Sequence, residues 1–114
     1  MRPAVLTLTA TGSTSPLPLD WRAQASFKVG FGGVVTTTGA IVWKIQRTFD
    51  NILDPSSGYT ATNATWFDDA TVGTATGSMY GSITEPCIAV RVTSTAFTGG
   101  ADKSLRVSFV QAGP

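Results

Sequence analysis

The feature that most constrains the fold of this chain is a two-residue period in its apolar side chains. It is clearest from Leu19 to Val29, where six apolar residues alternate with five polar residues. Successive side chains of a β-strand point to opposite faces, so this alternation gives one apolar face and one polar face. An α-helix would spread the same residues around its circumference. The segment is therefore predicted to be a strand with one buried face.

The same period recurs in three later segments. Their apolar members are Ile41, Trp43, Ile45 and Phe49 in the first, Ile88, Val90 and Val92 in the second, and Leu105, Val107 and Phe109 in the third. Arg47 interrupts the apolar face of the first segment near its end. Weaker strands are predicted for residues 4–10 and 73–80, and no stretch of ten residues has a helical period.

Glycine- and proline-containing segments separate these strands. Among them, residues 30–33 (Gly-Phe-Gly-Gly) are predicted to form a flexible hairpin or bulge. Six or more short strands with turns between them favour a two-layer antiparallel sandwich or a small barrel. We therefore predict an all-β chain with one β-sandwich domain over residues 19–114. Residues 1–18 are predicted to be an extended N-terminal segment or a first strand.

Composition excludes several classes of function. Histidine is absent and Cys87 is the single cysteine, so histidine-dependent triads, imidazole metal sites and multi-cysteine sites are excluded. The net charge is +1 without a basic run, so nucleic-acid binding is not expected. No apolar stretch is long enough to span a membrane, and the N-terminus does not resemble a secretory signal. The 18 threonines and 10 serines favour a polar, uncharged surface, which is common on β-proteins that pack against other proteins.

The acidic residues are the first candidates for a site. Asp50, Asn51 and Asp54 lie close together in the sequence, and Asp68 and Asp69 form a second acidic pair. Their spacing lacks the alternating ligands of a calcium loop, and Asp and Asn commonly cap backbone amides in turns. No sequence spacing fixes two of these carboxylates at a distance suited to glycoside hydrolysis. We therefore predict no catalytic residue, no metal and no cofactor.

The adjacent aromatic residues Trp66 and Phe67 are the second candidate. Two successive side chains of a regular strand cannot both face inward, and these two are followed directly by Asp68 and Asp69. One interpretation is a ring folded over the core. The other is an exposed ring that contacts a partner, as aromatic residues often do at interfaces. Cys87, by contrast, is predicted to be a small buried hydrophobic residue, because no histidine is present to activate it.

From about Val42 to the C-terminus, the sequence resembles small virion proteins of tailed bacteriophages. The resemblance lies in four segments, which are Thr48–Pro55 (TFDNILDP), Ala64–Phe67 (ATWF), Ala89–Thr93 (AVRVT) and Val107–Gly113 (VSFVQAG). Several proteins of this kind are regarded as capsid decoration or cement proteins with β-sandwich or jelly-roll folds. The resemblance therefore implies an antiparallel β-sandwich that is jelly-roll-like, and it supplies no catalytic residues.

The function implied by this resemblance is structural rather than enzymatic. The protein is expected to be made in the host bacterial cytoplasm and to bind the major capsid protein on the capsid surface of the virion, as a symmetric oligomer. The candidate partner contacts are Trp66, Phe67, Asp68, Asp69, Arg2 and Pro3. Residues 2–18 are expected to act as an arm, so that deleting residues 1–18 would weaken attachment more than folding.

Two alternatives remain open at this point. A tail or head–tail connector component would use a similar β-fold in few copies per particle. A carbohydrate-binding module would use Trp66 and Phe67 to stack on sugar rings.

Overall fold

The strands of the protein are seen in a computed structural model, which describes residues 4–19, 28–37, 39–69, 72–99 and 103–112. Within these residues the chain forms nine strands and the short 3-10 helix η1 (Pro55–Ser57). The strands are β1 (Ala4–Leu8), β2 (Gly12–Ser13), β3 (Leu17–Pro18), β4 (Lys28–Thr36), β5 (Ile41–Thr48), β6 (Trp66–Asp68), β7 (Met79–Ile83), β8 (Ala89–Phe97) and β9 (Ser104–Ala112).

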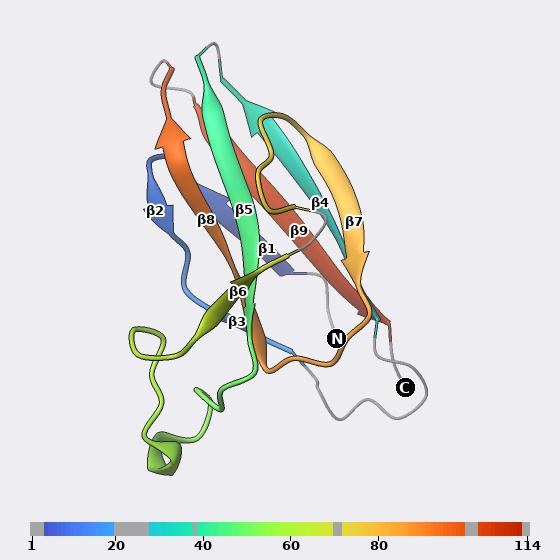
Figure 1. Cartoon of the computed structure of the whole chain (residues 1–114). Coiled ribbons are helices and arrows are strands. Elements are labelled where there is room, and N and C mark those ends of the chain that lie inside the picture. The colour runs from blue at the N-terminus through green and yellow to red at the C-terminus, as the bar shows by residue number, and fades with distance from the viewer. Residues whose placement is uncertain (1–3, 20–27, 38, 70–71, 100–102, 113–114) are drawn as a thin grey trace.

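The strands form two sheets that pack face to face (Figure 1). Sheet A has the order β1-β9-β4-β7, and sheet B has the order β2-β8-β5-β6, with β3 also paired to β8. Every strand pair is antiparallel. The predicted all-β antiparallel sandwich is therefore confirmed.

The pairing follows a jelly-roll ribbon. β1 pairs with β9, β2 and β3 pair with β8, β4 pairs with β7, and β5 pairs with β6, so the pairs are nested along the chain. Two further pairings, β4 with β9 and β5 with β8, roll this ribbon into two layers. A jelly roll is the sandwich that results when one long antiparallel ribbon is wrapped in this way.

The core lies between the sheets and follows the two-residue period. Its members from β4, β5 and β9 include Val29, Phe31, Ile41, Trp43, Ile45, Leu105, Val107 and Phe109. The indole of Trp43 is fully buried, and its Nε1 donates a hydrogen bond to the carbonyl oxygen of Gly77 at 3.0 Å. A Cβ atom at Gly33 would lie only 2.5 Å from Cη2 of this ring, so the indole needs a glycine beside it.

Two sequence predictions differ from the structure or lie partly outside it. The predicted turn at residues 30–33 is wrong, because these residues lie inside β4 between β9 and β7. Their inner positions, Phe31 and Gly33, continue the buried face that begins at Val29. Of the strand predicted over residues 19–29, residues 20–27 lie outside the described part of the chain. The weak strand predicted over 73–80 begins later, at Met79, although Ala75 forms a bridge to Trp43.

The N-terminal segment contributes strands to both sheets. β1 pairs with β9 over five residues, from Ala4↔Phe109 to Leu8↔Leu105, and Leu6 and Leu8 pack against the core. β2 and β3 pair with β8 on the other layer. The three short strands of this segment are thus paired with the late strands of both layers.

Candidate functional site

The predicted aromatic and acidic segment forms β6, the edge strand of sheet B. β6 pairs with β5 in the register Thr48↔Trp66, Arg47↔Phe67 and Gln46↔Asp68. Because Trp43 and Ile45 of β5 face the core, the even-numbered β5 positions face outward. Trp66 and Asp68 therefore lie on the outer face of sheet B, and Phe67 points to the opposite side of the strand.

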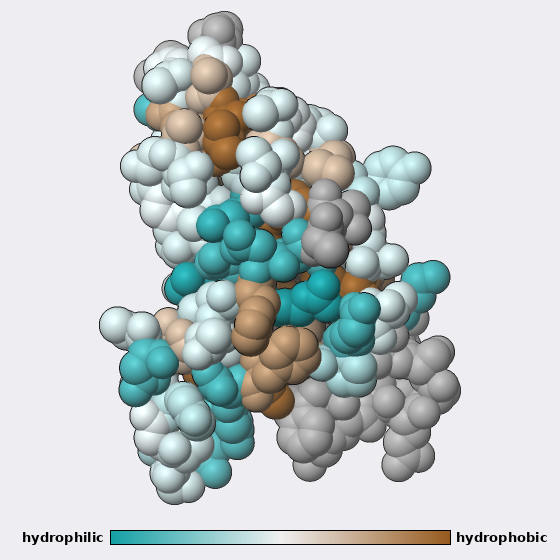
Figure 2. Space-filling model, in the orientation of Figure 1, coloured by the Kyte–Doolittle hydropathy of each residue, from teal (hydrophilic) through white to brown (hydrophobic). Residues whose placement is uncertain are grey.

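Phe67 is an exposed ring, with 52% of its surface accessible. It contacts Phe49 edge to face, with ring centroids 5.8 Å apart and an interplanar angle of 62°. Phe49 was predicted to belong to the buried face of its strand, but it lies just beyond β5 and is 53% exposed. Figure 2 shows a hydrophobic patch bordered by hydrophilic side chains over the β5–β6 region. Of the two adjacent aromatic residues, Phe67 is thus the exposed ring.

Trp66 is half-buried and held on two sides. Its Nε1 donates a hydrogen bond to the carbonyl oxygen of Ala61 at 3.0 Å. The guanidinium carbon of Arg91, on β8, lies 4.3 Å from the ring centroid, which is a cation–π contact. A sugar ring would need an open aromatic face, and Arg91 already covers this one. The face of Trp66 that Arg91 covers is therefore closed to a sugar ring.

Hydrogen bonds connect the outer face of sheet B across all four strands of its path. They join Ser13 to Thr93 (2.9 Å), Thr93 and Arg91 Nε to Gln46 Oε1 (3.1 and 2.9 Å), Gln46 Nε2 to Asp68 Oδ1 (2.9 Å) and Lys44 Nζ to Asp68 Oδ2 (3.4 Å). The hydrogen bond from Gln46 is the main cause that holds the pKa of Asp68 below its usual value, and Lys44 adds to it. This network fixes the orientation of the Gln46 amide.

The second acidic residue, Asp69, has a different environment. It is only 3% exposed, and its carboxylate pairs with Arg47 at 3.2 Å and accepts a hydrogen bond from the backbone N–H of Val72. Arg47 also pairs with Glu85 at 2.9 Å, and this hydrogen bond lowers the pKa of Glu85. Of the two neighbouring aspartates, only Asp68 lies at the surface.

Cys87 is confirmed as a buried residue of the core. It is 2% exposed, and burial raises the pKa of its thiol to about 11. A thiol in this state is a poor nucleophile, because the reactive species is the thiolate.

The first acidic cluster has the predicted turn geometry. Asp54 accepts hydrogen bonds from the backbone N–H and hydroxyl of Ser56, Asn51 accepts one from the backbone N–H of Leu53, and Asp50 accepts one from that of Thr65. Among the residues that the structure describes, no three His, Cys, Asp or Glu side chains are placed to hold a metal ion. The other predicted contacts, Arg2 and Pro3, lie outside the described residues.

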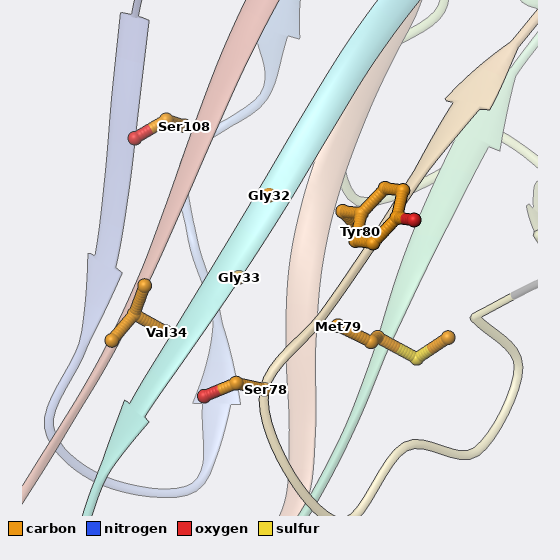
Figure 3. Close-up of a pocket in the computed structure, with 7 residues that line it drawn as sticks. All are labelled: Gly32, Gly33, Val34, Ser78, Met79, Tyr80 and Ser108. Carbon is orange, nitrogen blue, oxygen red and sulfur yellow. The ribbon is translucent and has the colours of Figure 1, made fainter.

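A second surface, which sequence reasoning missed, is a shallow apolar groove on the outer face of sheet A. It is lined by Gly32, Gly33, Val34, Ser78, Met79, Tyr80 and Ser108. Figure 3 shows Ser108 from β9 and Tyr80 from β7 on either side of these two glycines of β4. Tyr80 is 84% exposed, and Val34 and Val110 are also exposed on this face. The sequence pattern that could have indicated this surface is an apolar or aromatic residue at an outward position of each of three strands, namely Val34 on β4, Tyr80 on β7 and Val110 on β9.

Of the two glycines that line this groove, Gly33 is required by the buried Trp43 ring, whereas Gly32 has no such requirement. Gly30 and Gly32 occupy outward positions of β4, and neither has a positive φ. A Cβ atom at Gly32 would meet nothing within 4 Å, and one at Gly30 would make only an ordinary contact of 3.9 Å. Glycine in a strand interior costs about 0.5–1 kcal/mol relative to alanine and often marks a place where another molecule approaches the backbone.

The charged residues of the sheet A strands have one sign. Lys28 and Arg106 occupy outward positions of β4 and β9. Sheet A strands β1, β4, β7 and β9 contain no Asp or Glu. A partner at this face would therefore meet apolar groups and cations, but no carboxylate from these strands.

Comparison with known proteins gives no family for the chain. No family model, no curated protein and no solved structure matches it. No helix in the described part of the chain is long and apolar enough to cross a membrane. Function must therefore be inferred from the two outer sheet faces, whose side chains offer contacts to another molecule.

Proposed function

We propose that this protein is a structural component of a tailed-bacteriophage particle. In this proposal it is a capsid decoration protein, which binds the outside of the assembled capsid and stabilises it by bridging capsid subunits. The observation that carries the proposal is the apolar groove on the outer face of sheet A, with Gly32, which no internal contact requires to be glycine, and the exposed Tyr80.

The groove has the composition of a protein-binding surface. Tyrosine is enriched at interfaces and at the few positions that dominate their energetics. Gly32 lets a partner side chain approach the β4 backbone between Ser108 and Tyr80. An apolar segment of the capsid protein with nearby carboxylates would fit both the groove and the cations Lys28 and Arg106.

The whole chain suits attachment in many copies. A protein that binds only the assembled shell stabilises that shell by mass action, and many modest contacts add up. A net charge of +1 limits both repulsion between crowded copies and non-specific attraction to packaged DNA. Jelly-roll sandwiches occur among viral capsid proteins, although they also serve many other functions. The resemblance of residues 42–114 to small virion proteins supports the same function.

The test is the copy number of this protein relative to the major capsid protein in purified particles of the source phage. We expect a ratio within a few-fold of one copy per capsid subunit. A handful of copies per particle would instead indicate a tail or connector component. Complete absence from particles would overturn the virion proposal.

A variant test addresses the groove itself. Gly32→Leu fills the groove floor where the structure has open space, so the chain is expected to fold. We expect its affinity for particles assembled without this protein to fall at least about tenfold, which corresponds to roughly 1.4 kcal/mol. Thr95→Leu places the same leucine side chain at an exposed position of β8 in the other sheet and should bind normally. Equal binding of both variants would exclude the groove as the attachment surface.

A further inference from the structure

The strands of sheet B contain two arginines, Arg47 on β5 and Arg91 on β8, and the two differ in their partners. Arg47 forms ion pairs with both Asp69 and Glu85. Arg91 has no carboxylate partner among the described residues, and its one hydrogen bond there runs from Nε to the neutral amide oxygen of Gln46 at 2.9 Å. The guanidinium of Arg91 therefore carries a charge that the described part of the chain leaves uncompensated.

The guanidinium of Arg91 is also held in a fixed plane. Trp66 lies against its face at 4.3 Å, and Gln46 accepts its Nε–H. Gln46 is buried and cannot turn away, because its Nε2 donates to Asp68 while its Oε1 also accepts from Thr93. Guanidinium carries five N–H donors, so the donors on its two Nη atoms remain available for an acceptor in the right plane.

Partial burial makes an acceptor favourable at this position. Burial lowers the pKa of Arg91, which means that its charge has been partly withdrawn from water. A charge in such a position is stabilised by an opposite charge with matching hydrogen-bond geometry. Asp68 does not supply it, because Asp68 pairs with Lys44 and is linked to Arg91 only through the amide of Gln46.

We propose that Arg91, on its Trp66 platform, binds a carboxylate of a partner protein, an aspartate or glutamate side chain, through a bidentate pair with its Nη atoms. A planar monoanion matches the single guanidinium fork. A phosphate dianion would be less suitable for two reasons. The carboxylate of Asp68 belongs to the same network and would repel a second negative charge. Among the described residues of this network, Arg91 is also the one cation without an acidic partner, so one positive charge would face two negative charges. This inference rests on the proposed function, since it names the chemistry of a second contact with the capsid.

The position of Arg91 fits a bridging protein. The apolar groove lies on the outer face of sheet A, and Arg91 lies on the outer face of sheet B, on the opposite side of the sandwich. A protein that joins two neighbouring subunits needs two separate contact surfaces. The groove and the Arg91 site are two such surfaces.

The test is an NMR titration of the 15N-labelled full chain with sodium acetate and with poly-L-glutamate. The signals to follow are the Arg91 Nε–H and the Trp66 Nε1–H, with sodium chloride as the ionic-strength control. We expect saturable shifts of both signals, with poly-glutamate acting at a carboxylate concentration at least about tenfold lower than acetate because neighbouring carboxylates raise the effective concentration. The Arg47 Nε–H, which already has two acidic partners, should not shift.

Two variants make the result decisive. Arg91→Gln should abolish the Trp66 shift, and Arg91→Lys, which keeps the charge but loses the planar fork, should weaken binding about tenfold. Thermal unfolding of both variants checks that the fold is retained. Shifts equal to those in sodium chloride, shifts that persist in Arg91→Gln, or tighter saturation by inorganic phosphate would each overturn the carboxylate site.

The outcome is separable from that of the proposed function. The copy number of the wild-type protein in particles reports whether the protein is a virion component, whichever residues make the contact. A positive titration with no copies in particles would support a carboxylate site and overturn the virion proposal. Normal copy number with a negative titration would overturn the carboxylate site alone.

Discussion

At the scale of single residues, the neighbours Gly32 and Gly33 have opposite requirements. Gly32 faces open space on the outer side of β4, whereas Gly33 faces the buried ring of Trp43. We expect Gly32→Ala to raise the free energy of unfolding by about 0.5–1 kcal/mol, because alanine loses less backbone entropy on folding. We expect Gly33→Ala to lower it by about 1–3 kcal/mol, because the added methyl group overpacks the core.

Urea unfolding of the two alanine variants and the wild type gives this comparison directly. The variants serve as matched controls, since each adds one methyl group to an adjacent position of the same strand. If Gly32→Ala were as destabilising as Gly33→Ala, the outward position would also have a structural need for glycine. The groove would then lose its main support as a binding surface.

Cys87 gives a second prediction at this scale. Its pKa is raised from 9.0 to about 11, so at neutral pH the thiolate is about 100-fold rarer than in a free thiol. We expect a thiol-specific reagent such as DTNB to label the folded chain at least that much more slowly than the urea-unfolded chain. Rapid labelling of the folded chain would show that this thiol is accessible and would contradict its place in the core.

At the scale of elements, β1 is predicted to be part of the folded structure rather than a detachable arm. Two of its leucines, Leu6 and Leu8, pack against the core, and all five of its residues pair with β9. Deleting residues 1–8 should therefore lower the free energy of unfolding by roughly 3 kcal/mol, from the loss of two partly buried leucines. This differs from the sequence expectation that the segment contributes more to attachment than to folding.

Urea unfolding of the truncated chain measures that loss. Leu6→Ala should reproduce part of it, and Thr7→Ala, at the exposed position between the two leucines, should change stability by less than about 0.5 kcal/mol. A truncated chain with wild-type stability and weakened attachment would restore the arm interpretation.

The elements also show which parts of the fold can be predicted from sequence. β5, β8 and β9 were predicted because their inward and outward residues differ in polarity, and this contrast is a local property of the chain. β4 was mistaken in part for a turn, because Gly30 and Gly32 occupy its outward positions and resemble turn residues in composition. Burial of Val29, Phe31 and Gly33 against the core fixes the extended conformation of β4, and this burial depends on the tertiary structure.

The candidate site was predictable only in part for a similar reason. Trp66 and Phe67 were recognisable as adjacent aromatic residues, and a regular strand places them on opposite faces. Arg91 was not recognisable as their neighbour. The registers of β5 with β6 and of β5 with β8 bring it over Trp66, and no local pattern in the sequence encodes both registers.

At the scale of the whole molecule, acid is expected to destabilise the fold. Hydrogen bonds from Gln46, Arg47 and Ser56 lower the folded-state pKa values of Asp68, Glu85 and Asp54, respectively. The unfolded chain, with ordinary values of 3.8 for Asp and 4.5 for Glu, therefore binds protons at higher pH than the folded chain. The contribution of these groups to the free energy of unfolding should be constant above about pH 6 and should fall as the pH drops below about 4.5.

Urea midpoints between pH 7 and pH 3 test this dependence. In Glu85→Gln the contribution of the contact with Arg47 is removed, so the fall should be smaller than in the wild type. With no histidine in the chain, no imidazole adds a transition between pH 5 and pH 8. An unchanged midpoint down to pH 3 would contradict the assigned hydrogen bonds.

The place of β9 in sheet A has a consequence for how the chain is made. This strand, which is synthesised after the other described strands, lies between β1 and β4. Sheet A therefore cannot form while residues 104–112 are still in the ribosomal tunnel. Until then β1 has no partner strand in sheet A. A messenger broken upstream of these codons yields a chain with unpaired strand edges, which are prone to aggregation. A chain that ends before residue 104 contains every strand of sheet B but leaves β1 separated from the β4–β7 pair, so the complete sandwich requires synthesis through β9.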